Sequence, residues 1–306
     1  MKVAIIGRSE IMYDTALLLR AAGHEVRAVV TAKEAPEYTR GSADFRALAE
    51  SWGVPFLHTA KITEAEGLLR AAAPLDIGIS YNYSGIIPGS IIGLFRLGVL
   101  NAHGGDLPRY RGNACQAWAI LNGEDRVGLC VHSMVPDELD SGDIIARDYF
   151  PLTLRTKVTA VHEWMQHRVP QLFGEAVAKL QRDPRYVLEV QSKDPKDALR
   201  CHPRRPEDGR IDWRASAEDI LRLVNACNKP YAGAFCRLDG KPMVVWDADL
   251  GPEENYLAVP GQVARIGADS IDVATGRGLL TLKLVEADGA VLPPARLVRS
   301  ARSRLE

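Results

Sequence analysis

The sequence predicts an α/β protein with two domains, a Rossmann-like, mostly parallel sheet followed by a small β-barrel of the OB type. Two observations support this fold class. Short apolar runs alternate with amphipathic helical patterns from the first residues to about residue 101, as in βαβ units. Beyond residue 201, one amphipathic segment precedes several short strand patterns separated by turn residues, as in a small barrel. We therefore predict an α/β domain over residues 1–200 and a β-barrel domain over residues 201–306.

The N-terminal half alternates between strands and helices. Its apolar, β-branched runs predict strands at 3–6, 25–30, 54–57 and 77–80. The intervening periodic segments predict helices at 12–22, 45–52 and 64–72. Gly7 follows the first strand, but the further glycines of the dinucleotide-binding fingerprint are missing. A dinucleotide cofactor is therefore not indicated.

The second half predicts two more strands, a long helix and the barrel. Strands are expected at 127–135 and 144–150, and a helix at 158–180 that Pro170 should kink or split. The segment 201–209 is polar and rich in turn residues, which predicts a linker. After it we expect a helix at 217–228 and strands at 235–238, 243–246, 262–266, 270–273 and 279–285.

Composition excludes several classes of protein. The formal net charge is −1, far from the basicity of a nucleic-acid-binding protein. Five cysteines without C-x-x-C spacing indicate neither a zinc site nor a disulfide framework, so we expect reduced thiols and no metal. The chain opens on a strand pattern and has no run of the roughly 20 apolar residues that a membrane helix needs. We therefore predict a cytoplasmic protein with no membrane segment, and we leave a homodimer open.

Functional side chains concentrate between residues 101 and 143. Asn101 and His103 end an apolar run, and residues two apart on a strand point to the same face. Asp140, in the turn-like segment D-E-L-D-S-G-D, can supply a carboxylate that orients the imidazole. Spacing alone leaves an alternative open, in which Asn101 and His103 cap a turn and Asp140 lies in a surface turn.

The surrounding motifs decide between these alternatives. The matching segments are N-A-H at 101–103, L-P-R-Y-R-G at 107–112, W-A-I at 118–120 with G-E at 123–124, 128–132, and D-S-G-D-I-I at 140–145. Together they resemble the 10-formyltetrahydrofolate-dependent formyltransferase family, which includes enzymes that formylate methionyl-tRNA, glycinamide ribonucleotide and sugar nucleotides. The linker around 204–213 and the turn at 228–235 extend the resemblance to about residue 290.

The resemblance implies a formyl donor, a catalytic set and a folate pocket. The donor would be 10-formyltetrahydrofolate, and Asn101, His103 and Asp140 would be catalytic. The folate pocket would lie between the loop at 80–88 and the segment at 139–143, with the contacts Ile86, Ile87, Pro88, Leu139 and Asp143. One departure is Gly105-Asp106, where many members have Ser-Leu. Asp106 would either touch the acceptor amine or cap the turn.

The three catalytic groups match what formyl transfer to an amine requires. The attacking amine must lose a proton, which His103 would accept. The carbonyl oxygen gains negative charge, which the Asn101 amide would stabilise by donating a hydrogen bond. Asp140 would hold the imidazole and favour its charged form.

The acceptor is predicted from charge and from the resemblance. Residues 201–306 contain 15 Lys and Arg and 15 Asp and Glu, so their net charge is zero, and the loop at 31–40 is nearly neutral. Binding of tRNA requires positive charge, so we predict no nucleic-acid partner. The segments 80–83 and 86–88 are instead similar to those of sugar-nucleotide N-formyltransferases, such as the formyltransferase half of the enzyme that formylates UDP-4-amino-4-deoxyarabinose.

We therefore predict formylation of a nucleotide-linked amino sugar in surface-polysaccharide biosynthesis. The alternatives are a methionyl-tRNA formyltransferase, a formyltetrahydrofolate hydrolase, an enzyme for another amine, and a non-catalytic binding protein. The predicted acceptor contacts are Tyr81, Tyr83, Asp106, Arg111, Arg204 and Tyr231.

Overall fold

A seven-stranded sheet forms the centre of the N-terminal part of the computed structural model, which describes residues 1–83 and 85–306. The strand order is β3-β2-β1-β4-β5-β7-β8. The strands from β1 to β5 pair in parallel, and β7 runs antiparallel to β5. The predicted Rossmann-like, mostly parallel sheet is thus confirmed. The strands are β1 (Lys2–Gly7), β2 (Glu25–Thr31), β3 (Phe56–His58), β4 (Ile77–Tyr81), β5 (Val99–His103), β7 (Arg126–Ser133) and β8 (Ile144–Pro151).

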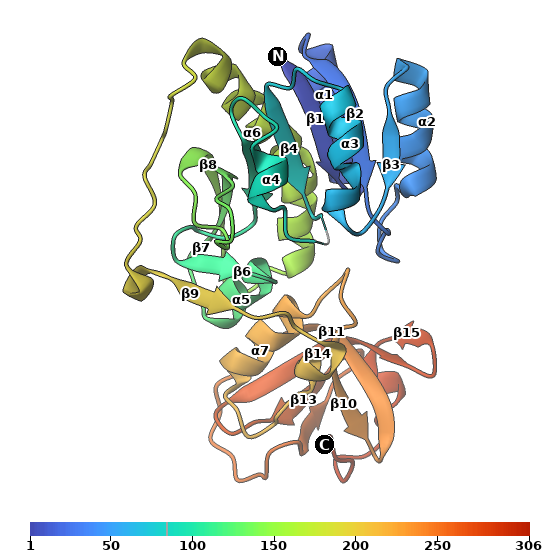
Figure 1. The fold of residues 1–306 in the computed structure, drawn as a ribbon. Coiled ribbons are helices and arrows are strands. Elements are labelled where there is room, and N and C mark those ends of the chain that lie inside the picture. The colour runs from blue at the N-terminus through green and yellow to red at the C-terminus, as the bar shows by residue number, and fades with distance from the viewer. Residues whose placement is uncertain (84) are drawn as a thin grey trace. The chain divides into compact units, whose positions relative to one another are not determined.

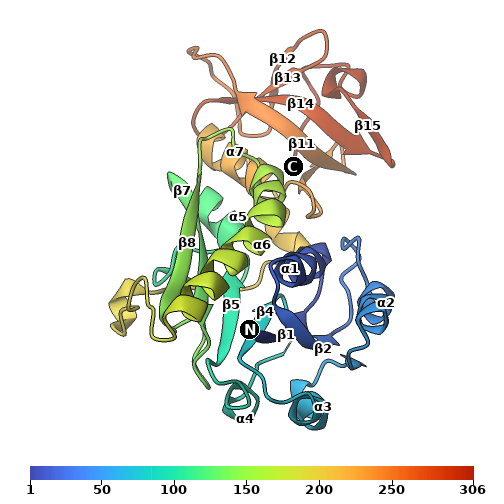
Figure 2. The same cartoon turned by 90° about the horizontal axis from the view of Figure 1, so that it is seen from above.

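Helices cover both faces of this sheet (Figure 2). The segment η1 (Ile62–Ala65), α3 (Glu66–Ala71) and α4 (Gly89–Ile92) pack against one face, where Ile6, Val30 and Val99 share a core with them. On the other face lie α1 (Glu10–Ala21) and α6 (Val158–Arg182), while α2 (Ser42–Trp52) lies beside β2 and β3. Burial on both faces explains the continuous apolar run of β1, whose Ile5 and Ile6 are fully buried.

The helix α6 differs from its prediction at Pro170. It continues through the proline as one element of 25 residues, so the predicted split is wrong. Proline removes one backbone donor from a helix, but Val169, Leu172, Phe173 and Val177 are fully buried around it. Their packing holds the helical path on both sides of the proline.

The chain divides into two compact units (Figure 1). The first comprises 1–112, 128–150 and 163–201, and the second comprises 113–127, 151–162 and 202–306. The last segment of the second unit starts at residue 202, next to the predicted domain boundary. The second unit also includes 113–127 and 151–162, which the sequence analysis assigns to the N-terminal domain. One of these contains α5 (Cys115–Leu121), which packs against α7 (Ala217–Ala226).

The second unit contains a six-stranded antiparallel sheet with one helix. The paired path is β10-β11-β14-β13-β12, and β15 pairs with β14. The side chain of Ser216 caps α7 by accepting a hydrogen bond from the Asp219 amide. These strands are β10 (Ala234–Leu238), β11 (Lys241–Leu250), β12 (Val263–Ile266), β13 (Ile271–Ala274), β14 (Leu279–Ala287) and β15 (Ala290–Leu292).

The last residues of the chain lie between the two ends of that path. Arg237, in β10, exchanges two backbone hydrogen bonds of 2.8 Å with Glu306. On the other side, the Leu305 amide donates to the Gly261 carbonyl, and the Leu305 side chain is buried. A closed barrel requires hydrogen bonds that join the two ends of the sheet, and the C-terminal residues supply bonds to both ends. The OB-like barrel itself stays a prediction.

The remaining elements of the first unit are two short strands, β6 (Tyr110–Gly112) and β9 (Leu199–Cys201), which pair in parallel. Three 3-10 turns lie later in the chain, at Pro195–Asp197, Pro206–Gly209 and Pro294–Arg296. All five cysteines are free thiols and buried. No helix among the described residues has the length and apolar character needed to span a membrane.

Candidate active site

Strand β5 carries Asn101 and His103 at its carboxyl end, between β4 and β7. Asn101 is the register partner of His132 on β7, and the side-chain Nδ2 of Asn101 lies 3.3 Å from Nε2 of His132. The ring of His103 is buried and lies edge-on to the ring of His132, with centroids 6.3 Å apart. The amide and the two imidazoles therefore occupy one face of the sheet, as the two-residue spacing predicts for Asn101 and His103.

Asp140 approaches the same face from the turn between β7 and β8. Its backbone has a φ of 48°, a left-handed conformation that Asp tolerates. The turn is tight because Gly142 packs directly on the backbone oxygen of Ser133, leaving no room for a Cβ atom. The carboxylate Oδ2 lies 3.6 Å from Nδ1 of His103 and accepts a hydrogen bond of 2.9 Å from the Gly112 amide. The structure thus brings Asn101, His103 and Asp140 together.

The electrostatics of Asp140 favour a permanent carboxylate. Burial alone would raise its pKa, but the charge interaction with His103 and the hydrogen bond from the Gly112 amide outweigh burial. The pKa of Asp140 is therefore far below its usual range. The group supplies a fixed negative charge at neutral pH.

The electrostatics of His103 favour a neutral ring at neutral pH. Burial lowers its pKa below 6.5 and outweighs the opposing effect of Asp140. Its Nε2 lies 2.6 Å from the Tyr110 carbonyl, which assigns the proton to Nε2 and the lone pair to Nδ1 on the side of Asp140. If the ring took up a proton at Nδ1, its two N–H groups would face the Tyr110 carbonyl and the Asp140 carboxylate. This arrangement suits a general base.

His132 is a site residue that the sequence analysis did not single out. It is 2% exposed and lies between Asn101 and Asp140, with Nε2 3.7 Å from Oδ1 of Asp140. His132 ends the segment 128–132, which resembles a family motif, and this resemblance could have pointed to it as a site residue. Its position opposite Asn101 depends on the antiparallel pairing of β7 with β5, which local sequence patterns do not show.

Gln191 is a second residue that the sequence analysis missed. Its amide nitrogen donates to the backbone oxygen of Asp140 at 3.1 Å, and its Oε1 accepts from Arg111 at 3.0 Å. Gln191 is 1% exposed and comes from the segment after α6. Gln191 therefore holds the backbone of the turn that carries Asp140 and accepts a hydrogen bond from Arg111, which the sequence analysis predicts as an acceptor contact.

The predicted folate residues fall into two groups. Leu139 and Asp143 lie on either side of Asp140 in the same turn. Leu139 is 41% exposed, and the carboxylate of Asp143 accepts a hydrogen bond from the backbone N–H of Gln191 at 3.2 Å. Ile86 is 82% exposed, Ile87 is buried in the core, and Pro88 precedes α4 as its cap residue. Ser84, in the predicted loop at 80–88, lies outside the described residues. A direct folate contact for these five residues stays a prediction.

The predicted acceptor residues are divided between the two units. In the first unit, Tyr81 is buried at the end of β4, and the Tyr83 hydroxyl donates to the Thr59 carbonyl. Burial raises the pKa of Tyr83 to about 12. In the second unit, Arg204 lies over the Trp118 ring, and the Tyr231 hydroxyl lies 3.2 Å from Nε2 of His162.

Asp106 is engaged by Arg147 through an ion pair of 2.6 Å. The same arginine contacts the Leu107 carbonyl and Glu189. These contacts favour the alternative in which Asp106 stabilises its turn over the alternative in which it touches the acceptor amine.

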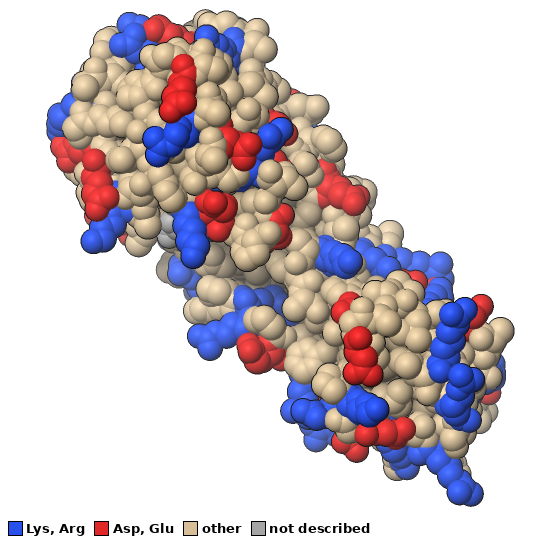
Figure 3. Space-filling view, turned by 90° about the vertical axis from the view of Figure 1, so that its right-hand side faces the viewer, with Lys and Arg blue, Asp and Glu red and all other residues tan. Residues whose placement is uncertain are grey.

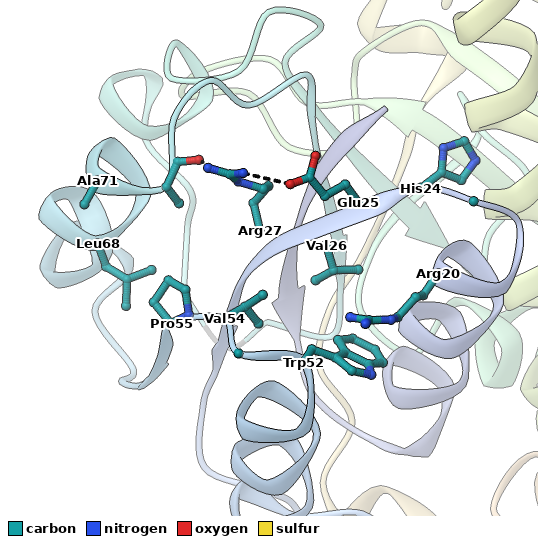
Figure 4. Close-up of a pocket in the computed structure, with 13 residues that line it drawn as sticks. Arg20, His24, Glu25, Val26, Arg27, Trp52, Val54, Pro55, Leu68 and Ala71 are labelled. Carbon is teal, nitrogen blue, oxygen red and sulfur yellow. Dashed lines mark hydrogen bonds and ion pairs between the residues drawn. The ribbon is translucent and has the colours of Figure 1, made fainter.

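Two cavities lie away from the residues of this site. One, of about 720 Å³, includes Arg27, Arg20 and Trp52 in its lining, with Arg20 stacked over the Trp52 ring and Arg27 paired with Glu25 (Figure 4). Glu25 begins β2, so this cavity lies at the amino ends of the parallel strands, opposite the edge that bears His103. The other, of about 750 Å³, is lined by residues of the second unit around Tyr256. Neither is lined by a predicted folate residue.

The described residues contain no cluster of side chains that could bind a metal ion. No group of three or more His, Cys, Asp or Glu side chains there is arranged to hold an ion.

Known families match both parts of the chain. Residues 1–177 match the family described as "Formyl transferase", and residues 204–302 match "Formyl transferase, C-terminal domain". A methionyl-tRNA formyltransferase of Pelotomaculum thermopropionicum is 30% identical over 305 residues, which cover 95% of this chain and 92% of that protein. One of Desulfotalea psychrophila is 31% identical over 296 residues, covering 94% and 89%. One of Citrifermentans bemidjiense is 29% identical over 303 residues, covering 96% and 92%.

Solved structures share the fold at low sequence identity. The structure of WlaRD, a sugar 3N-formyl transferase, has a TM-score of 0.67 at 15% identity and covers 92% of this chain and 97% of that one. HypX from Aquifex aeolicus in complex with tetrahydrofolic acid has a TM-score of 0.62 at 20% identity. The match covers 97% of this chain but spans only 46% of HypX.

The relatives correct the predicted acceptor. Four curated relatives, 29–31% identical over nearly the whole chain, are methionyl-tRNA formyltransferases. The prediction of a nucleotide-linked amino sugar as acceptor is therefore wrong. The chain belongs to the formyl transferase family, and it is a formyltransferase whose formyl donor is 10-formyltetrahydrofolate.

Proposed function

We propose that the enzyme transfers the formyl group of 10-formyltetrahydrofolate to the amino group of methionyl-tRNA. The observation that carries this proposal is the similarity to methionyl-tRNA formyltransferases, which extends over both units and covers about nine tenths of each relative. A tRNA acceptor would also agree with the predicted cytoplasmic location.

The site geometry supports a mechanism with three roles. The methionyl amine attacks the formyl carbon, and His103 takes the amine proton at Nδ1, where Asp140 stabilises the resulting imidazolium. The Asn101 amide donates to the oxygen that becomes negative in the tetrahedral intermediate. Collapse of this intermediate breaks the bond between the formyl carbon and N10 of the folate. The proton returns to that nitrogen, and tetrahydrofolate leaves.

Local charge in the second unit supports a polyanionic acceptor despite the neutral total. Four exposed arginines recur near the C-terminus, and no ion pair involving their guanidinium groups is formed among the described residues: Arg296, Arg299, Arg302 and Arg304. Lys and Arg side chains gather along one edge of the C-terminal unit (Figure 3). Exposed charges farther apart than the Debye length of about 8–10 Å are largely screened from one another. The net charge of a whole domain therefore does not show whether positive side chains cluster locally.

A competition assay tests the acceptor. Purified enzyme and 10-formyltetrahydrofolate are mixed with methionyl initiator tRNA, with uncharged tRNA, or with a panel of nucleotide-linked amino sugars, and release of tetrahydrofolate is followed. We expect release with methionyl-tRNA and formation of formylmethionyl-tRNA. Release with no acceptor would indicate a hydrolase, and release with another amine alone would overturn the proposal.

A further inference from the structure

His132 makes its closest side-chain contacts with one backbone oxygen and one amide. Its Nδ1 lies 2.9 Å from the Ser133 carbonyl, and its Nε2 lies 3.3 Å from Nδ2 of Asn101. Oδ1 of Asp140 lies 3.7 Å from the same Nε2, beyond hydrogen-bond length. The ring is 2% exposed, so solvent does not compete for these contacts.

These contacts define which nitrogen of His132 carries the proton. A carbonyl oxygen only accepts hydrogen bonds, so the short contact to Ser133 requires a proton on Nδ1. A neutral ring then has its lone pair on Nε2. An amide presents either an N–H or an oxygen, and only the N–H can bond to that lone pair. The tautomer of His132 thereby selects the orientation of the Asn101 amide.

We propose that His132 is a positioning residue that holds the Asn101 amide with its N–H groups toward the reacting carbonyl. One N–H of Nδ2 is used by His132, and the second remains for the developing oxyanion. Rotated by a half turn, the amide would present its oxygen and repel that charge. This inference rests on the proposed catalytic role of Asn101, but it does not depend on which amine accepts the formyl group.

Substitution of His132 separates a positioning role from a packing role. We expect His132→Ala to lower kcat about 10-fold to 10²-fold, approaching the loss of about 10²–10³ expected for Asn101→Ala. KM for 10-formyltetrahydrofolate should change less than about threefold, because the donor is still bound. His132→Gln should recover most of kcat, since its side-chain oxygen can accept from Asn101 near the position of Nε2. His58→Ala, an exposed histidine on β3 of the same sheet, serves as the control with normal kcat.

A double-mutant cycle shows whether His132 acts through Asn101. In the Asn101→Ala background, adding His132→Ala should lower kcat by less than about twofold, because the amide to be oriented is already gone. Multiplicative losses would overturn the proposal. Normal kcat in His132→Ala, or failure of His132→Gln to restore it, would also overturn it.

A spectroscopic measurement keeps the proposal testable if His132→Ala does not fold. Spectra of ¹⁵N-histidine in the wild-type enzyme at neutral pH should show His132 protonated at Nδ1 and unprotonated at Nε2. A proton on Nε2 would contradict the proposal. Wild-type enzyme that does not formylate methionyl-tRNA would refute the acceptor assignment alone, whereas full activity of Asn101→Ala with its true acceptor would refute the catalytic set.

Discussion

A buried neutral imidazole beside a buried carboxylate is the central feature of the site at the scale of single residues. His103→Ala removes the proposed base and should lower kcat about 10²–10⁴-fold. Asp140→Asn leaves the backbone intact, because Asn also tolerates the φ of 48° at this position. It should lower kcat by a similar factor with little change in thermal stability. Steady-state kinetics and thermal melting of both variants check this prediction.

Asp140→Ala is the matched comparison. It removes the same charge but places a residue with a Cβ and no polar tip in a left-handed conformation, which costs about 1–2 kcal/mol. We expect the same loss of kcat as in Asp140→Asn together with a lower melting temperature. Near-wild-type turnover in either Asp140 variant would refute its role beside His103.

The pH dependence of the reaction follows from the direction of the His103 shift. Because burial lowers its pKa below 6.5, the ring is neutral and able to accept a proton at pH 7. Activity should therefore fall as pH decreases through a midpoint below 6.5. Asp140 raises the His103 pKa, so Asp140→Asn should move this midpoint to still lower pH.

The pH profile of kcat/KM in the two enzymes measures this shift. The acceptor amine also titrates, and a free α-amino group has a pKa of about 7.7–8.0, so its ionisation is measured on the free acceptor and divided out of each profile before the midpoints are compared. After this correction, an acidic midpoint above 6.5 in the wild type, or a midpoint that moves upward in Asp140→Asn, would be incompatible with His103 as the buried base.

At the scale of elements, the turn between β7 and β8 places Asp140 in the site. Gly142 lies against the backbone oxygen of Ser133, so a Cβ there must displace the strand or the turn. We expect Gly142→Ala to destabilise the protein by about 1–3 kcal/mol through overpacking and to reduce activity, because Asp140 moves with the turn. Denaturant unfolding and turnover measure the two effects.

Gly67 provides the control for this substitution. It lies in α3 with a helical backbone, and a Cβ at this position would meet open space. Gly67→Ala should therefore stabilise the protein by about 0.5–1 kcal/mol and leave turnover unchanged. Equal stability of the two variants would show that the turn can relax around a side chain.

Sequence patterns predicted the elements that are stabilised locally and missed those that depend on distant pairing. The strand ending at Gly7 contains the continuous apolar run Val3–Ile6, which sequence patterns recognise because both faces of the strand are buried. The pairing of β6 with β9 joins residues almost 90 positions apart, and no local pattern indicates it. His132 and Gln191 were missed for the same reason, since their roles arise from a neighbouring strand and from a returning segment. Pro170 does not split α6, because the side chains around it are buried in the core.

At the scale of the whole molecule, the prediction of the acceptor used the zero net charge of residues 201–306 and the near-neutral loop at 31–40. The net charge of a domain counts a charged side chain in the same way whether or not it forms an ion pair. A positive side chain without an ion-pair partner attracts phosphates more strongly than one that is already paired. In the second unit, Arg214 is paired with Asp212, and Arg265 is paired with Glu254. The arginines close to the C-terminus are instead exposed at the end of the chain. Distribution, and not total charge, therefore bears on the class of acceptor.

The salt dependence of acceptor binding tests this distinction. A protein that neutralises several phosphates loses affinity steeply with salt, with a log–log slope of roughly one per contact. We expect KM for methionyl-tRNA to rise steeply between 50 and 200 mM salt, on the order of the concentrations at which such contacts weaken, and KM for the folate donor to rise much less. The double variant Arg302→Glu/Arg304→Glu should raise KM for the tRNA and reduce the slope by about 1–2. The matched variant Arg182→Glu/Arg185→Glu, in the first unit, should leave the slope unchanged. A KM for methionyl-tRNA that does not respond to salt would mean that phosphate contacts do not hold the acceptor, and the neutral total charge would then have been the better guide.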